Sequence, residues 1–210
     1  MAGCAKNPAD SVPSAQVQTQ TPATVDTPAP GLTPSQAGSA TPSAAVEGTV
    51  YAFTEGTEIG FVGSKVTGSH DGGFKKVDGT VTVPGENLEQ AVVELTIDMT
   101  TIYSDDEKLT DHLKSPDFFA VEQFPQSTFK STSLKQEGDG YTVTGDLTMH
   151  GVTKAITFPA KIAVEGDSVR AAAEFSINRK DFGVAYPGKP DDLIRDDVVI
   201  KFDLTASKKV

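Results

Sequence analysis

The chain has 210 residues and a formal net charge of −11 at pH 7. No basic stripe offsets this charge, which argues against nucleic acid as a partner, because phosphate backbones are bound through clustered lysine and arginine. The sequence also lacks an apolar run of about 18 residues, so no transmembrane helix is predicted.

A change of composition near residue 46 divides the chain. Seven of the 13 prolines precede position 43, whereas every Phe and Tyr follows position 50. Residues 1–46 are mostly Ala, Pro, Ser, Thr and Gln, so they cannot bury enough apolar surface to offset the entropy of ordering. We expect a disordered tether over 1–46 and one folded domain over 47–210, a length sufficient for a real core.

The single cysteine, Cys4, follows Ala2-Gly3 and precedes the Pro/Ala/Thr-rich stretch. One cysteine excludes an internal disulfide. Its setting is typical of the lipidation site of a bacterial lipoprotein, and two or more acyl chains would anchor the domain stably. The alternative is a free thiol. We favour the anchor, and so expect an exported, lipid-anchored protein in the periplasm or outer cell envelope that contacts membrane through its anchor only.

Alternation of apolar and polar residues, which is the signal of half-buried strands, recurs through the folded part. Glycine-rich turn sequences such as Glu137-Gly138-Asp139-Gly140 separate the alternating runs. Eight or nine strands with one apolar face each predict a sandwich or an up-and-down barrel. The predicted strands are 50–54, 58–67, 74–83, 93–99, 127–136, 141–149, 156–164, 173–177 and 198–204.

Residues 104–119 break this alternation. Ser104 and Glu107 have the spacing of a capping box, and Leu109 and Leu113 lie one turn apart on one helical face. Pro116 ends the pattern. We predict a short helical insert that covers an open end of the barrel.

Three motifs resemble the YceI-like, polyisoprenoid-binding family of lipocalin-like proteins. They are Asp111–Phe119, Gly145–Lys154 and Asn178–Gly183, in that order along the chain. The resemblance implies an all-β fold: an extended antiparallel eight-stranded lipocalin-like β-barrel with one short helical insert. It also implies an apolar tunnel for a long isoprenoid chain, such as that of a quinone or polyprenyl lipid, and export to the periplasm.

The inward-facing side chains fit either a packed core or a cavity. Pattern alone favours a packed core, and the resemblance reverses that preference for a subset. His112, at the edge of the helix's buried face, is expected to make a hydrogen bond that fixes the helix, with contact to a ligand head group as the alternative. The candidate ligand-binding residues are Phe61, Leu95, Ile97, His112, Phe118, Phe119, Phe129, Tyr141, Leu147, Phe158 and Phe175.

Signals of catalysis are weak. His70, His112 and His150 are far apart in sequence and form no metal-ligand spacing, and neither a nucleophile motif nor a phosphate loop is present. Arg179 and Asp181 are expected to share one face of a strand end as an ion pair. We therefore expect a lipid-binding protein without cofactor or metal, and not an enzyme. The alternatives are an enzyme that uses His112 and an aspartate on a hydrophobic substrate, and a tethered interaction module without a ligand.

Overall fold

The computed structural model describes residues 6–18, 47–54, 57–85, 87–190 and 192–209. Within them one α-helix, α1 (Glu107–Lys114), accompanies an otherwise all-β fold. The strands that build the wall are β2 (Thr49–Phe53), β3 (Glu58–Lys65), β4 (Gly68–Phe74), β5 (Val77–Val83), β6 (Val92–Asp98), β7 (Ile102–Ser104), β8 (Gln126–Glu137), β9 (Gly140–Met149), β10 (Val152–Glu165), β11 (Ser168–Asn178) and β14 (Asp197–Lys208).

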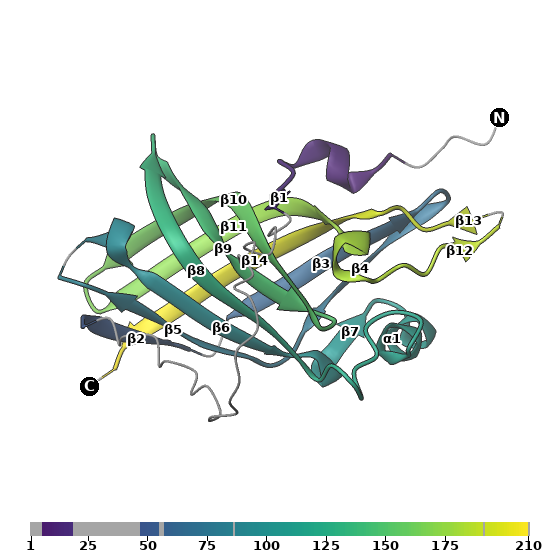
Figure 1. Ribbon diagram of the computed structural model, residues 1–210, viewed down its shortest axis with the longest axis horizontal. Helices are drawn as coiled ribbons and strands as arrows, with labels where there is room; N and C mark the ends of the chain where they lie inside the picture. The colour runs from purple at the N-terminus through teal and green to yellow at the C-terminus, as the bar shows by residue number, and fades with distance from the viewer. Residues whose placement is uncertain (1–5, 19–46, 55–56, 86, 191, 210) are drawn as a thin grey trace, which may run out of the picture.

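Eight of these strands close a ring. Its order is β10-β9-β8-β6-β5-β2-β14-β11, and β11 returns to β10. Every neighbouring pair in it is antiparallel. This confirms the predicted antiparallel eight-stranded barrel, which Figure 1 shows to be elongated.

The wall extends beyond the ring at one end. β14 pairs with β2 through 206–208 and with β3 through 199–203, so β2 and β3 follow each other along one edge of β14. In the same way β4 continues β5, and β7 continues β6. The helix α1 and a small hairpin of β12 (Gly188–Lys189) and β13 (Asp192–Leu193) lie at this extended end (Figure 1).

Burial along the strands follows the predicted alternation. In β8 the side chains of Ser127, Phe129 and Ser131 are buried, and those between them are exposed. The β9–β10 hairpin turns through His150 and Gly151. Both residues have positive φ, as the two central residues of a type I′ hairpin turn require. Alternation and turn chemistry together set which face of each strand points inward.

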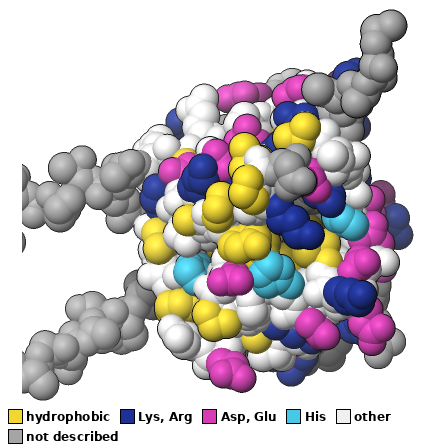
Figure 2. All heavy atoms as spheres, turned by 90° about the vertical axis from the view of Figure 1, so that its right-hand side faces the viewer, with side chains coloured by type: hydrophobic (Ala, Val, Ile, Leu, Met, Phe, Trp, Pro, Cys, Tyr) yellow, Lys and Arg dark blue, Asp and Glu magenta, His cyan; other side chains and the backbone are white. Residues whose placement is uncertain are grey.

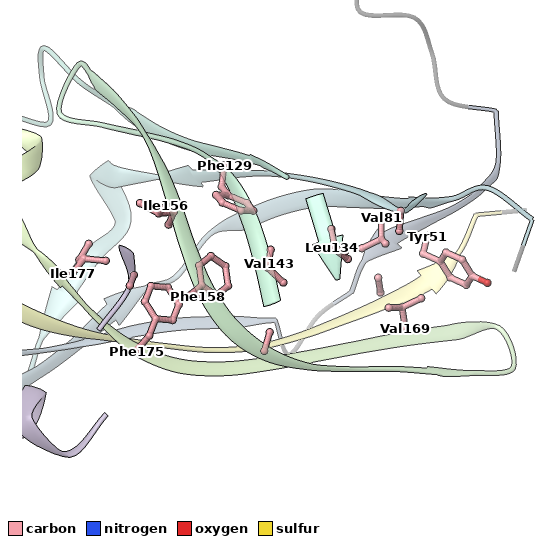
Figure 3. Packing of buried hydrophobic residues seen from close by; sticks show 14 of the residues in the cluster. Tyr51, Val81, Phe129, Leu134, Val143, Ile156, Phe158, Val169, Phe175 and Ile177 are labelled. Atoms are coloured by element: carbon pink, nitrogen blue, oxygen red, sulfur yellow. The ribbon is translucent and has the colours of Figure 1, made fainter. Parts of the chain in front are cut away.

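The interior differs between the two ends of the barrel. At the end away from α1 the side chains of Tyr51, Val81, Leu134 and Val169 pack closely together (Figure 3). Toward the other end Phe129, Ile156, Phe158, Phe175 and Ile177 surround open space. The packed core therefore closes the barrel at the end away from α1, which we call the floor, and the half of the barrel nearer α1 is hollow.

The N-terminal segment departs from the prediction of a disordered tether over 1–46. Residues 6–18 fold against the barrel through a 3₁₀ helix, η1 (Pro8–Ser11), and a short strand, β1 (Gln16–Gln18), that pairs with β10. Ala9 packs on Val62 and Val199, two apolar side chains on the outer face of the barrel, and shields them from solvent. Residues 19–46 and Cys4 lie outside the described residues.

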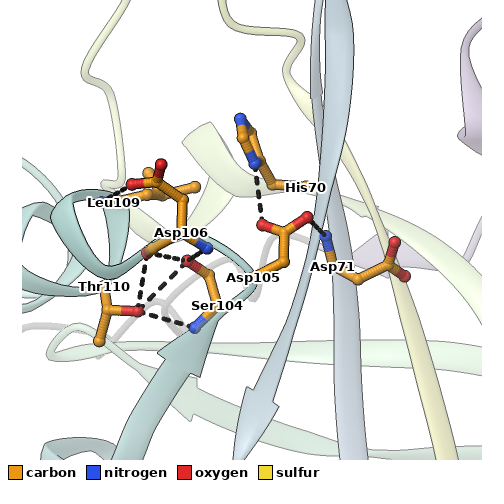
Figure 4. Close-up of polar contacts among 7 residues, drawn as sticks. All are labelled: His70, Asp71, Ser104, Asp105, Asp106, Leu109 and Thr110. Atoms are coloured by element: carbon orange, nitrogen blue, oxygen red, sulfur yellow. Dashed lines mark hydrogen bonds and ion pairs between the residues drawn. The ribbon is translucent and has the colours of Figure 1, made fainter.

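The start of α1 also departs from the predicted capping box. Asp106, not Ser104, is the N-cap, and its carboxylate accepts a hydrogen bond from the Leu109 backbone N–H at 2.8 Å. The Ser104 backbone N–H instead donates to the Thr110 hydroxyl at 2.9 Å (Figure 4). Thus Ser104 joins β7 to the first turn of α1, and Glu107 makes no return bond to it.

Three further 3₁₀ turns shape the connections. They are η2 (Leu88–Gln90), η3 (Met99–Thr101) and η4 (Arg179–Phe182). In η2, η3 and η4 the residue before the turn is Asn or Asp, whose side chain accepts a backbone N–H, as expected of an N-cap.

Candidate functional site: an apolar cavity with a polar mouth

The hollow half of the barrel contains a cavity of about 590 Å³. Its wall is built almost entirely from apolar side chains of the barrel strands. It opens at the end formed by α1, the β3–β4 hairpin and the β12–β13 hairpin, whose residues Leu109, His70 and Lys189 line it. Figure 2 looks onto this end and shows hydrophobic side chains at its centre, with histidine, basic and acidic side chains around them.

Ten of the eleven candidate ligand-binding residues line this cavity. Tyr141 does not. It occupies the inward face of β9 as expected, but it lies beside the β8–β9 turn, where it packs on the floor of the barrel. The ten that line the cavity are Phe61, Leu95, Ile97, His112, Phe118, Phe119, Phe129, Leu147, Phe158 and Phe175.

Several lining residues were not among the candidates. Phe74 and Phe202 continue the inward faces of β4 and β14, Met149 ends β9, and Met99 begins η3 directly after β6. Extension of the alternation to every strand would have identified most of them. Others of this kind are Ile59, Val143, Ile156, Ala160, Ile177, Val198 and Ile200.

Aromatic rings form one side of the cavity. Phe158 of β10 and Phe175 of β11 are stacked, with ring centroids 4.3 Å apart and planes within 11°. Phe129 and Phe202 approach Phe158 with centroids at 5.8 and 5.9 Å. These contacts hold the rings in place, and the stacked and inclined rings present an apolar surface to the cavity.

Two histidine–aspartate pairs lie at the mouth. The Nδ1 atom of His70 is 2.8 Å from a carboxylate oxygen of Asp105, which joins β4 to the segment before α1 (Figure 4). His112 Nε2 is 2.9 Å from Asp117, so His112 links α1 to the turn that follows it, as expected. Its ring also packs edge-on against Phe118 and Tyr186, with centroids at 4.9 and 5.0 Å.

The Asp192 carboxylate joins the β12–β13 hairpin to the β3–β4 hairpin, beside a backbone hydrogen bond from the Val66 N–H to the Leu193 carbonyl at 3.2 Å. Asp192 accepts from the Lys65 ammonium at 2.7 Å and from the Thr67 hydroxyl at 2.8 Å. The hydrogen bond from Lys65 is the main reason that the pKa of Asp192 lies below its usual value. The Lys65 ammonium at the mouth is therefore already paired with a carboxylate of the protein.

The predicted ion pair between Arg179 and Asp181 is wrong. Asp181 pairs with Lys154 at 3.0 Å, whereas Arg179 pairs with Asp196 at 3.2 Å. The strand ends at Asn178 and becomes the 3₁₀ turn η4, in which positions two apart no longer share a face.

Arg179 is only 5% exposed and lines the cavity from below the mouth. Its guanidinium donates to the carbonyls of Val184 and Arg195 at 2.7 and 3.1 Å. Burial lowers the pKa of Arg179, and Asp196 opposes this shift. These bonds hold the segment that carries the β12–β13 hairpin.

The described residues include no group of three or more His, Cys, Asp or Glu side chains arranged to hold a metal ion. Among them no helix has the length and apolar character needed to cross a membrane.

Comparisons with known proteins agree with this architecture. Protein YceI of Escherichia coli O157:H7 is 41% identical over 119 residues, which cover 54% of this chain and 62% of that protein. The matching protein of Salmonella arizonae gives the same figures. The match therefore spans less than two thirds of the length of these curated relatives.

Solved structures share the fold. BcnA of Burkholderia cenocepacia has a TM-score of 0.66 and 28% identity, and the alignment covers 72% of this chain and 96% of BcnA. A polyisoprenoid binding domain from Saccharophagus degradans has a TM-score of 0.63 at 14% identity, with 78% and 100% covered. The model of the YceI-like domain matches residues 51–206, so the chain belongs to the YceI-like domain family.

Proposed function

We propose that this protein binds a long-chain isoprenoid or similar lipid, such as an isoprenoid quinone, in its barrel and carries or stores it. The observation that carries the proposal is the apolar cavity of about 590 Å³. Its volume falls within the roughly 300–1,000 Å³ typical of small-molecule sites. The similarity in fold to a polyisoprenoid binding domain supports the same ligand class.

The energetics favour a hydrocarbon tail. Each buried methylene contributes roughly 0.8 kcal/mol. A tail of a few isoprene units would therefore offset the cost of association and reach micromolar affinity, about −8 kcal/mol. Polar groups occur mainly at the mouth, where His70 and His112 could bond a head group.

We further propose that the protein acts in the periplasm or at the outer cell envelope, anchored through acyl chains on Cys4. This rests on the sequence around Cys4. Intact-mass measurement of the protein from its native envelope fraction tests it. We expect Cys4 as the acylated N-terminus, and an unmodified chain that starts at Met1 would contradict the anchor.

Lipid extraction followed by mass spectrometry tests the ligand. We expect the purified full chain to release a lipid with a prenyl tail in near-stoichiometric amount. A chemically altered lipid would favour an enzyme instead. A barrel that releases no lipid, and that takes up none when offered, would contradict the proposal and favour an interaction module.

A further inference from the structure

The barrel wall is split on one side. β10 and β11 pair only where Lys161–Glu165 lie opposite Ser168–Ala172. Beyond this point β10 stays paired with β9 and β11 with β14, but the two strands no longer bond each other. Ile156 and Phe158 of β10 and Phe175 and Ile177 of β11 flank this split and line the cavity.

The N-terminal segment fills the split. Val17 of β1 lies opposite Ile156 in an antiparallel ladder with β10. On the other side Ser14 forms a parallel bridge with Ser176 of β11, where the Ala15 N–H donates to the Ser176 carbonyl at 2.8 Å and the Ser176 N–H to the Pro13 carbonyl at 2.9 Å. The segment thus bonds both strands, and Figure 1 shows β1 beside them.

The side chains of this segment alternate as they do in the rest of the wall. Ala15 is buried in the cluster that contains Phe158 and Phe175, and Val17 packs against the same cluster. Ser14, Gln16 and Gln18 are exposed. The inward residues are the apolar ones, as in a strand with one face toward a barrel interior.

The other end of the segment is also fixed. Asn7 accepts a hydrogen bond from the Ser64 hydroxyl at 3.3 Å, next to Lys65 at the mouth. Between these ends Ala9 covers Val62 and Val199. Residues 7–18 therefore run from the mouth, across the outside of β3 and β14, and into the split.

We propose that residues 13–18 complete the barrel wall beside the cavity: Ala15 and Val17 do not line the cavity themselves but pack against the cluster of Phe158 and Phe175, which do. These residues precede the family match, which begins at residue 51. Without them the cavity would open sideways beside Phe158 and Phe175, and β10 would present unpaired backbone groups. A bound tail would then have a second exit. The expected effect on ligand retention rests on the proposed function, whereas the part that residues 13–18 play in the barrel wall does not depend on it.

The wall is tested without a ligand by thiol accessibility. Cys4→Ser removes the single native thiol, and Ile156→Cys places a reporter at a side chain only 2% exposed beside the split. Ala15→Asp with Val17→Asp puts two carboxylates on the inward face, whereas Gln16→Asp with Gln18→Asp puts the same charges on the outward face. We expect a bulky maleimide to label the cysteine at position 156 at least tenfold faster in the variant with inward aspartates than in the variant with outward aspartates.

A second reporter separates local opening from loss of the fold. Leu134→Cys lies on β8 in the closely packed end of the barrel, outside the cavity and away from the split. Its labelling should not change between the two aspartate variants. Equal labelling of the Ile156→Cys reporter in both would overturn the proposal, as would equal acceleration at both reporters. Replacement of residues 13–18 by Gly and Ser gives a variant that adds no charge, should the inward aspartates prevent folding.

Ligand retention is then measured with dansyl-labelled farnesol as the probe. Its dissociation rate should rise about tenfold in the inward variant and stay unchanged in the outward one, because changes at one binding site act mainly on dissociation. Equal dissociation rates would contradict a role in retention. Failure of the probe to bind the unaltered chain would contradict the proposed function. Thiol labelling would still show whether residues 13–18 close the barrel wall.

Discussion

The hydrogen bonds of Arg179 join η4 to the segment before β14. The guanidinium donates to the carbonyls of Val184 and Arg195 and to the carboxylate of Asp196. Arg179→Leu keeps much of the volume but leaves the buried Val184 carbonyl without its donor, which costs roughly 1–3 kcal/mol of unfolding free energy. Denaturant unfolding measures this loss.

Lys180→Leu is the matched control for that variant. Lys180 bonds the other carboxylate oxygen of Asp196 at 2.9 Å but is exposed. Exposed pairs of this kind contribute about 0–1 kcal/mol. Equal destabilisation by the two substitutions would show that the buried bonds of Arg179 do not stabilise the fold.

Gly63 offers a way to fill the cavity without strain. It lies on β3 and lines the cavity, and a Cβ atom added there meets no atom within 4 Å. We expect Gly63→Phe to place its ring in the cavity and weaken the binding of a prenyl lipid at least tenfold, with little change in melting temperature.

The size of the residue at position 63 provides the control. Gly63→Ala adds one methyl group and should bind nearly as the unaltered chain does. Titration with the same lipid, together with thermal unfolding, distinguishes the outcomes. Unchanged affinity for Gly63→Phe would place the ligand elsewhere, and a collapse in melting temperature would mean that the ring does not fit the cavity.

The helix α1 depends on Asp106 for its first turn. Its carboxylate accepts from the Leu109 N–H, so Asp106→Ala should cost about 1 kcal/mol of unfolding free energy, as for other N-caps. Glu107→Ala, by contrast, should cost only a few tenths of that, through the helix dipole. A larger loss for Glu107→Ala would restore the capping box that the sequence predicts.

The elements differ in how far their sequence predicts them. Long strands such as β9 and β10 alternate over ten or more residues, so their inward faces follow from the pattern. β1 has three residues, too few for alternation to stand out from a Pro- and Ser-rich stretch. Residues 13–18 are ordered instead by backbone hydrogen bonds to the edges of β10 and β11. These strands lie far away in the sequence, so the local sequence of 13–18 does not reveal the pairing.

Depth inside the barrel is harder to predict than face. Tyr141 and Leu147 lie on the same face of β9, but Leu147 lines the cavity and Tyr141 packs on the floor. Alternation has a period of two residues and does not say where the interior closes. That point depends on side chains from strands distant in sequence, such as Val81, Leu134 and Val169.

Over the whole molecule the charge is strongly negative, and the mouth does not reverse it. Lys65 and Lys189 line the cavity together with Asp106 and Asp192. Lys65 is bonded to Asp192, and Asp105 and Asp117 accompany the two histidines of the mouth. The other cation of the described lining, Arg179, is paired with Asp196. A ligand with an anionic head group would therefore meet cations of which Lys65 and Arg179 are already paired, on a chain with a formal charge of −11.

We accordingly predict that a neutral isoprenoid binds more tightly than a diphosphate with the same tail. The test is a pair of titrations, with geranylgeraniol and with geranylgeranyl diphosphate, at one pH and one salt concentration. The tails are identical, so their burial cancels and the difference in affinity reports on the head group. We expect the alcohol to bind at least tenfold more tightly at low salt, and the difference to shrink as salt screens the repulsion. Tighter binding of the diphosphate would mean that Lys65, Lys189 or another cation turns toward the ligand, and that the arrangement of charges at the mouth outweighs the net charge of the chain.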